Sequence, residues 1–380
     1  MSERTALVLG GYGSFGRLVA ESLARQPQIR VVVAGRDPRA AAALCGVLGA
    51  RASPAQIDLD APGLGRRIAA LDPSVVINTA GPFQSRDYRV PRACIAAGAH
   101  YLDLADARQY VCDIHSLDAA AVRREVLVVS GASTCPALST AIVDEIAREL
   151  TIERISFGVA PGHRQARGLA TARAVLSYCG KPIPTLREGE AGHAAGWSGL
   201  TRHTFPRPVG ARWLSRVDLP ELGLWPSRYP ALQSLESRAG LEPAALHLGL
   251  TALSWLVRAR LLESLAPHAE SLLRMSARFE PFGTPVGAMH ITVAGRDRAG
   301  AMREKTWSIV AQRSDGPRIP VAPAVALAKR LLDLPGYAPL AARGAMACMG
   351  LLSSTEILAE LAGYSIHTQS DDKAPALTLP

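Results

Sequence analysis

Residues 6–24 read ALVLGGYGSFGRLVAESLA, and this stretch decides the fold. Residues 6–9 are a short apolar run of the kind that forms a buried strand. Four of the seven residues in 10–16 are glycine. From Phe15 to Leu23, apolar residues recur at helical spacing, with alanines between them as good helix formers. The stretch predicts a strand, a glycine-rich turn and a helix in direct succession.

The glycines of the turn are spaced as Gly11-x-Gly13-x-x-Gly16. In a nucleotide-binding turn the first glycine permits the tight bend, the second lets a pyrophosphate approach the main chain, and the third lets the helix pack closely on the strand. The helix N-terminus then offers free N–H groups and a partial positive charge to the phosphates. Because the motif lies between a strand and a helix, it favours a dinucleotide site over a turn that holds no ligand.

The next strand, predicted within residues 30–37, bears on which dinucleotide is bound. NAD-binding domains usually place an acidic residue at the end of this strand, where it accepts from the ribose 2′-hydroxyl. Here the strand ends in Gly35-Arg36, and an arginine suits a 2′-phosphate through charge-assisted hydrogen bonds worth about 1.5–3 kcal/mol. Asp37 follows directly and keeps an NAD-type contact open. We therefore expect NADP, with NAD as the alternative cofactor.

Further strands and helices alternate along the N-terminal part of the chain. Strands are expected at residues 57–59, 74–81, 101–104 and 126–129, and helices around 41–48, 63–71, 90–97 and 116–124. This alternation predicts an α/β fold with a doubly wound parallel sheet, a Rossmann domain. Its ligand should lie along the carboxyl ends of the strands, at the point where the strand order reverses.

The size, the charge and the cysteine content of the chain limit the classes of protein to which it can belong. At 380 residues the chain is long enough for two domains and a sizeable core. The net charge of +9 is carried almost wholly by scattered arginines, which argues against nucleic acid and suits an anionic cofactor. The six cysteines show no metal spacing, and the start is not signal-like. We expect free thiols, no metal site and a cytoplasmic protein.

The longest charge-free apolar stretch is residues 243–257, which is too short to span a bilayer. No transmembrane segment is therefore expected. Residues 241–275 are expected to form buried helices that line a pocket or a dimer contact. Contact with a membrane surface is an alternative that we rank below burial.

With these units placed, the chain resembles the saccharopine dehydrogenase-type oxidoreductases, a broad NADP-linked family. The resemblance rests on GGYGSFG at 10–16, VVVAGRD at 31–37, VVINTAGPF at 75–83 and ACIAAGAHYLDLAD at 93–106. A short segment, SYCG at 177–180, resembles an SYCGG stretch of the fungal saccharopine reductases. The C-terminal part matches moderately and the middle only loosely.

The resemblance implies a Rossmann NADP-binding domain at residues 1–150, then an α+β domain for substrate binding and dimerisation at 151–322. C-terminal helices at 323–370 would return to the Rossmann domain, and residues 371–380 are expected to be a disordered tail. By this reading the second domain carries a mixed or antiparallel sheet, through which the chain could form a homodimer.

The sequence supports the second domain independently. Residues 287–295 and 306–313 alternate like two antiparallel strands joined across 297–300. Residues 181–243 are rich in Pro, Gly, Trp and Arg and show no clear period. We expect a long covering segment there, part of it a lid.

The cofactor-binding candidates come from the glycine-rich turn and from the ends of the neighbouring strands. Gly81-Pro82-Phe83 is expected to run beside the nicotinamide ribose, with Phe83 shielding the ring from water. The full set is Gly11, Tyr12, Gly13, Ser14, Phe15, Gly16, Arg36, Asp37, Asp58, Ala80, Gly81, Pro82 and Phe83.

The catalytic candidates are Asp103, Tyr178, Cys179 and Lys181. A Tyr-x-x-x-Lys pair is absent, and no lysine precedes Lys181 to form the Lys/His pair of the lysine-forming family members. Asp103 ends a strand that should face the nicotinamide, where it would orient substrate or relay a proton, or else cap a turn. Cys179 would lie near the cofactor by resemblance, or serve only for packing. Lys181 is a candidate partner for an anion or an imine.

Three functions remain open. The first is an NADP-dependent oxidoreductase that moves hydride to or from a small substrate, by family default the C=N bond of an amino-acid-derived imine. The turn at 131–136 departs from the GLDPG-like turn of saccharopine reductases, which argues against saccharopine itself as the substrate. The second is an enoyl-type reductase of an apolar acyl substrate, with Leu248, Leu253 and Leu256 lining its pocket. The third is a non-catalytic NADP-binding or sensor protein.

Overall fold

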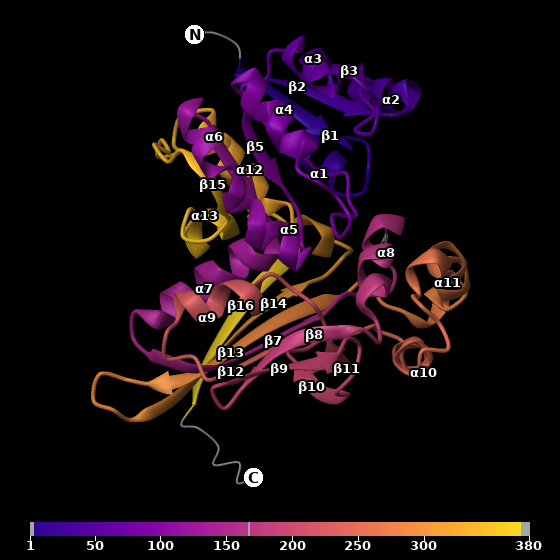
Figure 1. The fold of residues 1–380 in the computed structure, drawn as a ribbon, viewed down its shortest axis with the longest axis vertical. Coiled ribbons are helices and arrows are strands. Elements are labelled where there is room, and N and C mark those ends of the chain that lie inside the picture. Colours follow the sequence, from indigo (N-terminus) through magenta and orange to yellow (C-terminus); the bar gives the residue numbers. More distant parts are fainter. Residues whose placement is uncertain (1–3, 166–167, 374–380) are drawn as a thin grey trace. The chain divides into compact units, whose positions relative to one another are not determined.

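The computed structural model describes residues 4–165 and 168–373, and the chain divides into two compact units. The first unit comprises Met1–Leu138 and Pro317–Leu361, and the second comprises Ser139–Gly316 and Ala362–Pro380. Each unit therefore contains two separate stretches of the chain. Figure 1 labels the helices and strands of both.

The first unit is built on a seven-stranded sheet whose strands all run parallel. The order across the sheet is β15-β6-β5-β4-β1-β2-β3, so the direction of winding reverses between β1 and β4. The doubly wound parallel sheet expected from the sequence is thus confirmed. The strands are β1 (Arg4–Leu9), β2 (Ile29–Gly35), β3 (Ala52–Gln56), β4 (Val75–Asn78), β5 (His100–Asp103), β6 (Leu127–Ser130) and β15 (Gly344–Ala347).

Helices follow the strands of this sheet in βα rhythm. Asp37 starts the second helix, α2, because its side chain accepts from the main-chain N–H groups of Arg39 and Ala40. A reciprocal pair, Ser353 and Glu356, starts the last one, α13. The helices are α1 (Gly16–Ala24), α2 (Pro38–Leu48), α3 (Leu64–Ala69), α4 (Arg89–Ala97), α5 (Arg108–Cys112), α6 (Asp118–Arg123), α12 (Ala322–Leu331) and α13 (Ser354–Ala359), with shorter turns η1 (Asp113–Leu117), η2 (Thr134–Leu138) and η5 (Gly316–Arg318).

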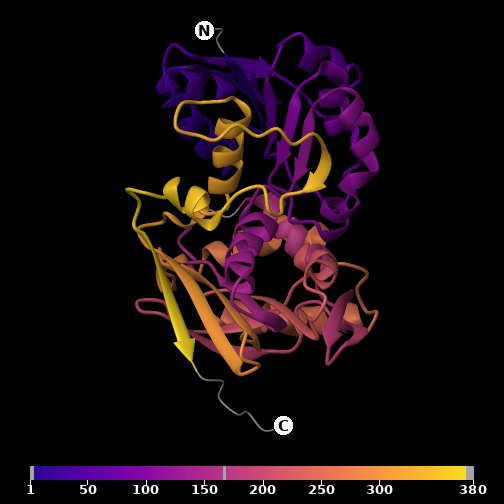
Figure 2. The same cartoon turned by 90° about the vertical axis from the view of Figure 1, so that its left-hand side faces the viewer.

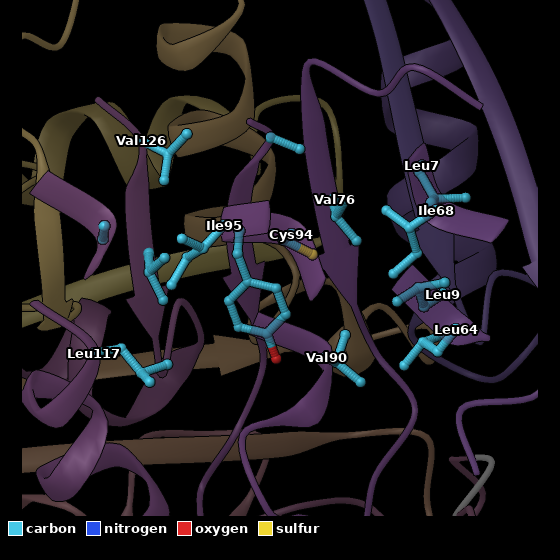
Figure 3. Close-up of a cluster of buried hydrophobic side chains, with 14 of the residues drawn as sticks. Leu7, Leu9, Leu64, Ile68, Val76, Val90, Cys94, Ile95, Leu117 and Val126 are labelled. Carbon is cyan, nitrogen blue, oxygen red and sulfur yellow. The ribbon is translucent and has the colours of Figure 1, made fainter. Parts of the chain in front are cut away.

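The core of the first unit lies between the sheet and the helices that cover it. Figure 3 shows aliphatic side chains of the sheet, among them Leu7 and Val76, facing Ile68 of α3 and Ile95 of α4. Parallel strands covered on both faces are apolar along their whole length, and β1 and β2 are buried almost throughout. The polar residues of the site therefore lie at the ends of these buried strands.

The prediction of a strand at residues 57–59 is wrong. The third strand is instead β3, and Ile57, Asp58 and Leu59 follow it as a loop. β3 is at the edge of the sheet, carries Pro54 and is only partly buried. An edge strand tolerates proline and needs no apolar run, so the apolar signal pointed to the wrong residues.

The second unit contains a nine-stranded mixed sheet. β12 pairs parallel with β7, while β13, β14 and β16 continue antiparallel from β7. Figure 2 shows the yellow strand β16 beside the orange strand β14. The strands are β7 (Thr151–Ala160), β8 (Pro182–Arg187), β9 (Glu190–Ala195), β10 (Thr201–Phe205), β11 (Gly210–Arg216), β12 (Ser234–Ala239), β13 (Gly287–Arg296), β14 (Met302–Ala311) and β16 (Ile366–Lys373).

The antiparallel pair expected around residues 287–313 is confirmed as β13 and β14. The prediction of a covering segment at residues 181–243 is wrong, because this stretch forms the strands β8 to β12 and one helix, α9. Its strands are short and several are exposed, which hid their alternation. The tail expected to be disordered has residues 371–373 in β16, and residues 374–380 lie outside the described part. The helices are α7 (Ser139–Ala147), α8 (Leu169–Tyr178), α9 (Glu221–Arg228), α10 (Ala244–Arg258) and α11 (Ala269–Ala277), with short turns η3 (Ala266–His268) and η4 (Glu280–Phe282).

The apolar stretch at 241–275 forms two helices, α10 and α11, that are only partly buried. Leu248, Trp255 and Leu256 of α10 are exposed, so the expectation of fully buried helices is wrong. One side of α10 packs against the rest of the second unit through Leu250, Leu253 and Val257, and the other side faces outward. In the part of the chain that the structure describes, no helix is both long and apolar enough to cross a membrane.

Replacing Gly16 by alanine should lower the free energy of unfolding by about 1–3 kcal/mol, as in an overpacked core. A Cβ at Gly16 would lie 2.2 Å from the Gly10 carbonyl oxygen. Gly46 of α2 is the matched control, because a Cβ there meets no atom within 4 Å. Gly46→Ala should raise the unfolding free energy by about 0.5–1 kcal/mol. Urea unfolding measures both, and equal effects of the two variants would contradict the close approach at Gly16.

Two buried histidines make the stability of the second unit depend on pH. The pKa of His290 is lowered to about 3, mainly by burial and also by the His203 ring stacked on it at 3.7 Å and by the charge of Arg238. Burial also lowers the pKa of His247 to about 4. Unfolded histidine titrates near pH 6.5, so the unfolded state binds these protons more readily and stability falls as the pH drops below that value.

The variant His290→Gln should therefore lose less stability than the wild type on going from pH 7 to pH 5. The difference should be about 2 kcal/mol, which is the proton-binding free energy of one unfolded histidine over this range. Urea unfolding at the two pH values measures it for both proteins. The same pH dependence in variant and wild type would show that His290 is not held neutral.

Candidate functional site

The glycine-rich loop between β1 and α1 leaves its main chain open at one corner. The Gly11 N–H donates to the Ala34 carbonyl (3.0 Å) and the Gly13 N–H to the Gly10 carbonyl (2.8 Å), which folds the loop tightly. Gly13 and Ser14 are exposed, and Phe15 directly precedes α1. The first turn of α1 holds no acidic residue to oppose an anion, although the Arg17 N–H already donates to the Gly13 carbonyl (3.0 Å).

Thr79 at the end of β4 holds this loop in place. Its hydroxyl lies 2.8 Å from the Leu9 carbonyl and 3.2 Å from the Gly10 carbonyl. A Cβ at Gly16 would also lie 2.6 Å from the Thr79 hydroxyl. The loop, the helix start and β4 are therefore in contact at one point, and only glycine fits there.

Tyr12 links the loop to the end of β2. Its hydroxyl accepts from the Asp37 N–H (2.8 Å), and its ring covers Gly35, where a Cβ would lie 2.4 Å from the ring. The Asp37 carboxylate accepts from Arg39 N–H (2.8 Å) and Ala40 N–H (3.2 Å), so it is engaged as the cap of α2. Arg36 is exposed beside it. The end of β2 thus presents an accessible guanidinium and a carboxylate that is occupied with its own helix.

The end of β4 is organised by Asn78, a buried residue that the sequence analysis did not select. Its amide oxygen accepts from the Ala80 N–H (3.1 Å), and its amide nitrogen donates to the Tyr101 hydroxyl (3.2 Å). A small pocket opens here, lined in part by Asn78, Ala80, Phe83 and Tyr110. A polar pair, Asn-Thr, directly after an apolar strand is the signal that could have found this position.

Phe83 and Asp58 lie on two sides of this region. Phe83 is buried, and its ring centroid is 5.4 Å from that of Tyr110, after the Gly81-Pro82 bend. Asp58 follows β3 and accepts from the Asp60 N–H (3.0 Å). Leu59, next in the chain, lines the same pocket as Ala80. The predicted cofactor residues thus come together from the loops after β1, β2, β3 and β4.

Asp103 ends β5 and is fully buried. One carboxylate oxygen accepts from the Ser130 hydroxyl (2.9 Å) and from the N–H groups of Gly131 (2.8 Å) and Ala105 (3.0 Å). Burial raises the pKa of Asp103 to about 6, although these donors act to lower it. Asp103 therefore ties the ends of β5 and β6 together beneath the surface through Oδ1, while its other oxygen, Oδ2, is buried and has no hydrogen-bond partner among the described residues.

Tyr178, Cys179 and Lys181 belong to the second unit, whereas Asp103 belongs to the first. Cys179 is fully buried, its thiol donates to the Val175 carbonyl (3.3 Å), and burial raises its pKa to about 12. A thiol in this environment stays protonated near neutral pH and is not a nucleophile. Tyr178 and Lys181 are half-buried, with the Lys181 N–H bonded to the Tyr178 carbonyl (3.0 Å). The described residues contain no cluster of His, Cys, Asp and Glu that could hold a metal ion.

Comparison with known proteins identifies the first of these units. Residues 6–129 match the family model described as the saccharopine dehydrogenase NADP binding domain. Apo saccharopine dehydrogenase (L-Glu forming) from Saccharomyces cerevisiae superposes with a TM-score of 0.67 at 15% identity, over 97% of this chain and 100% of that one. Homospermidine synthase from Legionella pneumophila, in complex with NAD, gives 0.61 at 11% identity, over 100% and 95%. No curated protein matches the chain significantly. The family predicted from the sequence is confirmed for residues 6–129, and the two solved structures share the fold of the chain.

Two substitutions of Asp103 should separate its charge from its hydrogen bonds. An ordinary aspartate has a pKa near 3.9, so the raised value means that the folded state holds the proton more tightly than the unfolded state. The wild type therefore loses stability as the pH rises from 4 to 7. Asp103→Asn has no such proton and should gain about 1–3 kcal/mol over the wild type across this range.

Asp103→Ala lacks the acceptor and should be about 1–3 kcal/mol less stable than the asparagine variant at every pH, because the Ser130 and Gly131 donors are left unpaired. Urea unfolding at pH 4, 5.5 and 7 gives both comparisons. A constant difference between wild type and Asp103→Asn would rule out a buried carboxylate with a raised pKa.

Proposed function

Residues 6–129 belong to the saccharopine dehydrogenase NADP-binding domain family, and from this premise we propose that the protein is an NADP-dependent oxidoreductase acting on a small substrate. The single observation that carries the proposal is the exposed main chain at Gly13 and Ser14. It lies at the N-terminus of α1, where no acidic side chain opposes a diphosphate. The tight shape of the loop depends on glycine at 11 and 16, because an added Cβ at either position would lie within 3 Å of the protein's own atoms.

In this proposal the pyrophosphate is held by the loop N–H groups and by the start of α1. The adenosine lies over the ends of β2 and β3, with Arg36 facing a 2′-phosphate and Asp58 beside the base. Ala80, Gly81 and Pro82 run along the sugar on the nicotinamide side. Phe83, packed on Tyr110, closes this side to water. When bound, NADPH supplies a hydride; the chain's own residues bind it, orient it and exclude solvent.

The preference for NADP follows from the different states of Arg36 and Asp37. An NAD-type domain needs a free carboxylate at the end of β2, and the Asp37 carboxylate already accepts from two main-chain N–H groups of α2. Arg36 is exposed and supplies the charge that a 2′-phosphate requires. The homospermidine synthase of similar fold was crystallised with NAD, so the choice between the nucleotides is a matter for direct titration.

The substrate class proposed is an amino-acid-derived compound with a C=N or CH–NH bond, which is what the family resemblance implies. Hydride adds to the carbon of the C=N bond, and a proton adds to its nitrogen. Asp103 is proposed to position the ends of β5 and β6 for this step, because its Oδ1 accepts from Ala105, Ser130 and Gly131 at those ends. Oxidation of NADPH in the presence of an amine together with a 2-oxo acid tests the class. Turnover of an enoyl thioester instead, or tight NADPH binding with no turnover of either, would overturn it.

The variant Arg36→Gln tests the nucleotide preference. We expect it to weaken NADPH binding by about 10–100-fold, which corresponds to the loss of 1.5–3 kcal/mol of charge-assisted hydrogen bonds, and to leave NADH affinity unchanged. Arg51→Gln is the matched control, because Arg51 is exposed but precedes β3 at the amino ends of the strands, whereas Arg36 follows β2 at their carboxyl ends. Fluorescence titration of the bound nicotinamide at fixed salt measures the NADPH and NADH affinities of the wild type and of both variants. Equal weakening of both nucleotides, or of neither, would contradict the assignment of Arg36 to a 2′-phosphate.

A further inference from the structure

The side chain of Tyr12 reaches from the glycine-rich loop to the end of β2. Its hydroxyl lies 2.8 Å from the Asp37 nitrogen, and its ring lies against Gly35, where an added Cβ would be 2.4 Å from a ring carbon. Gly35 is the last residue of β2, and Pro38 is the first residue of α2. The hydroxyl therefore lies at the turn between β2 and α2, where a dinucleotide-binding domain recognises the ribose of the adenosine.

This contact engages the main chain of Asp37 in addition to its side chain. The Asp37 N–H donates to the Tyr12 hydroxyl. The Asp37 carboxylate accepts from the N–H groups of Arg39 (2.8 Å) and Ala40 (3.2 Å) at the start of α2. An NAD-type site needs a carboxylate that accepts from the ribose 2′-hydroxyl. The N–H and the carboxylate of Asp37 are both bonded within the protein, which disfavours that contact.

The Tyr12 hydroxyl keeps its own proton for another acceptor. A phenol has one O–H donor and accepts through the lone pairs of its oxygen. The Asp37 N–H uses a lone pair, so the hydroxyl hydrogen points away from that nitrogen. In the part of the chain that the structure describes, this hydroxyl has no other hydrogen-bond partner, and Tyr12 is half-buried. The end of β2 therefore presents an O–H donor that a ligand can reach.

The residues next to this hydroxyl suit a phosphate. Arg36 and Arg39 are exposed, and they lie one and two residues from Asp37 along the chain. The carboxylate of Asp37 is directed to the N–H groups of α2. A phosphate monoester offers three strong acceptor oxygens, so it can accept from a hydroxyl and from guanidinium groups at once. Hydrogen bonds of this kind are charge-assisted and stronger than those to a neutral ribose hydroxyl.

We propose, on the basis of the proposed function, that Tyr12 is a specificity-determining residue whose hydroxyl donates to the 2′-phosphate of NADP. Tyr12 then acts on the choice of nucleotide in two ways. Its O–H favours the phosphate, and its contact with the Asp37 N–H withdraws a group that the ribose of NAD could use. The packing of the ring on Gly35 holds the hydroxyl in place before the nucleotide binds, so little conformational entropy is lost on binding.

The experiment is a titration of the intact protein with NADPH and NADH at constant ionic strength, with adenosine 2′-monophosphate as a competitor. Tyr12→Phe keeps the ring on Gly35 and removes the hydroxyl, so it should fold as the wild type does. We expect it to weaken the binding of NADPH and of adenosine 2′-monophosphate by about 3–10-fold and to leave NADH binding unchanged.

Tyr88→Phe is the matched control. Tyr88 is a half-buried tyrosine of the same unit, and its hydroxyl donates to the Tyr110 carbonyl (2.8 Å). The variant loses one hydroxyl, as Tyr12→Phe does, but at a position away from the end of β2. It should bind both nucleotides as the wild type does.

Phosphorus NMR of bound NADP adds a readout that a merely structural role of Tyr12 would not move. A phosphate monoester loses its second proton near pH 6. Hydrogen-bond donors in the site stabilise the doubly charged form, so the bound 2′-phosphate should titrate at a lower pH than in the free nucleotide. Tyr12→Phe should move this midpoint back toward the free value, and Tyr88→Phe should not.

The two measurements separate this role of Tyr12 from the proposed function itself. Equal weakening of NADPH and NADH by Tyr12→Phe would assign the hydroxyl to shaping the loop, and no weakening of either would show that it meets only solvent. Either result, or a 2′-phosphate that titrates alike in variant and wild type, overturns the role of Tyr12 and leaves the nucleotide site standing. If the wild type binds neither nucleotide, the role of Tyr12 and the proposed function fall together.

Discussion

The first unit depends on one close approach, between the start of α1 and the carbonyl of Gly10 at the end of β1. The absence of a side chain at Gly16 lets the helix sit directly on the strand. Thr79 then bonds to both the Leu9 and Gly10 carbonyls, so the end of β4 is drawn to the same point. Because β1 and β4 are the strands between which the winding reverses, this contact fixes the edge at which a ligand can lie.

A second layer of polar contacts beneath this edge keeps the strand ends in register. Asn78 bonds to the main chain after β4 and to Tyr101 on β5, and Asp103 bonds to Ser130 and Gly131 after β6. All of these side chains are buried and bonded to groups of the same unit, and among the described residues only the Oδ2 atom of Asp103 in this set has no partner. The carboxyl-terminal edge of the sheet is therefore held from below by buried polar side chains.

Much of the first unit could be predicted from the sequence because its signals are local. The glycine spacing, the apolar runs and Arg36 after β2 can each be recognised within a few residues. The family prediction rests on short motifs of this kind. β3 was missed because an edge strand with Pro54 carries no apolar signal, and β8 to β12 were missed because short exposed strands do not alternate clearly. Asn78 was missed because one of its partners, Tyr101, comes from a neighbouring strand, although the Asn-Thr pair at the end of β4 is a local signal that could have found it.

The strand β15 has a consequence for the order in which the protein is made. It comes from residues 344–347, yet it pairs with β6, whose residues are synthesised far earlier. While the ribosome is still producing the second unit, β6 has a bare edge with unpaired N–H and C=O groups. Such an edge is a template for pairing with another chain. The nascent first unit is therefore vulnerable to aggregation until the last part of the polypeptide emerges, and a fragment ending before that part would stay so permanently.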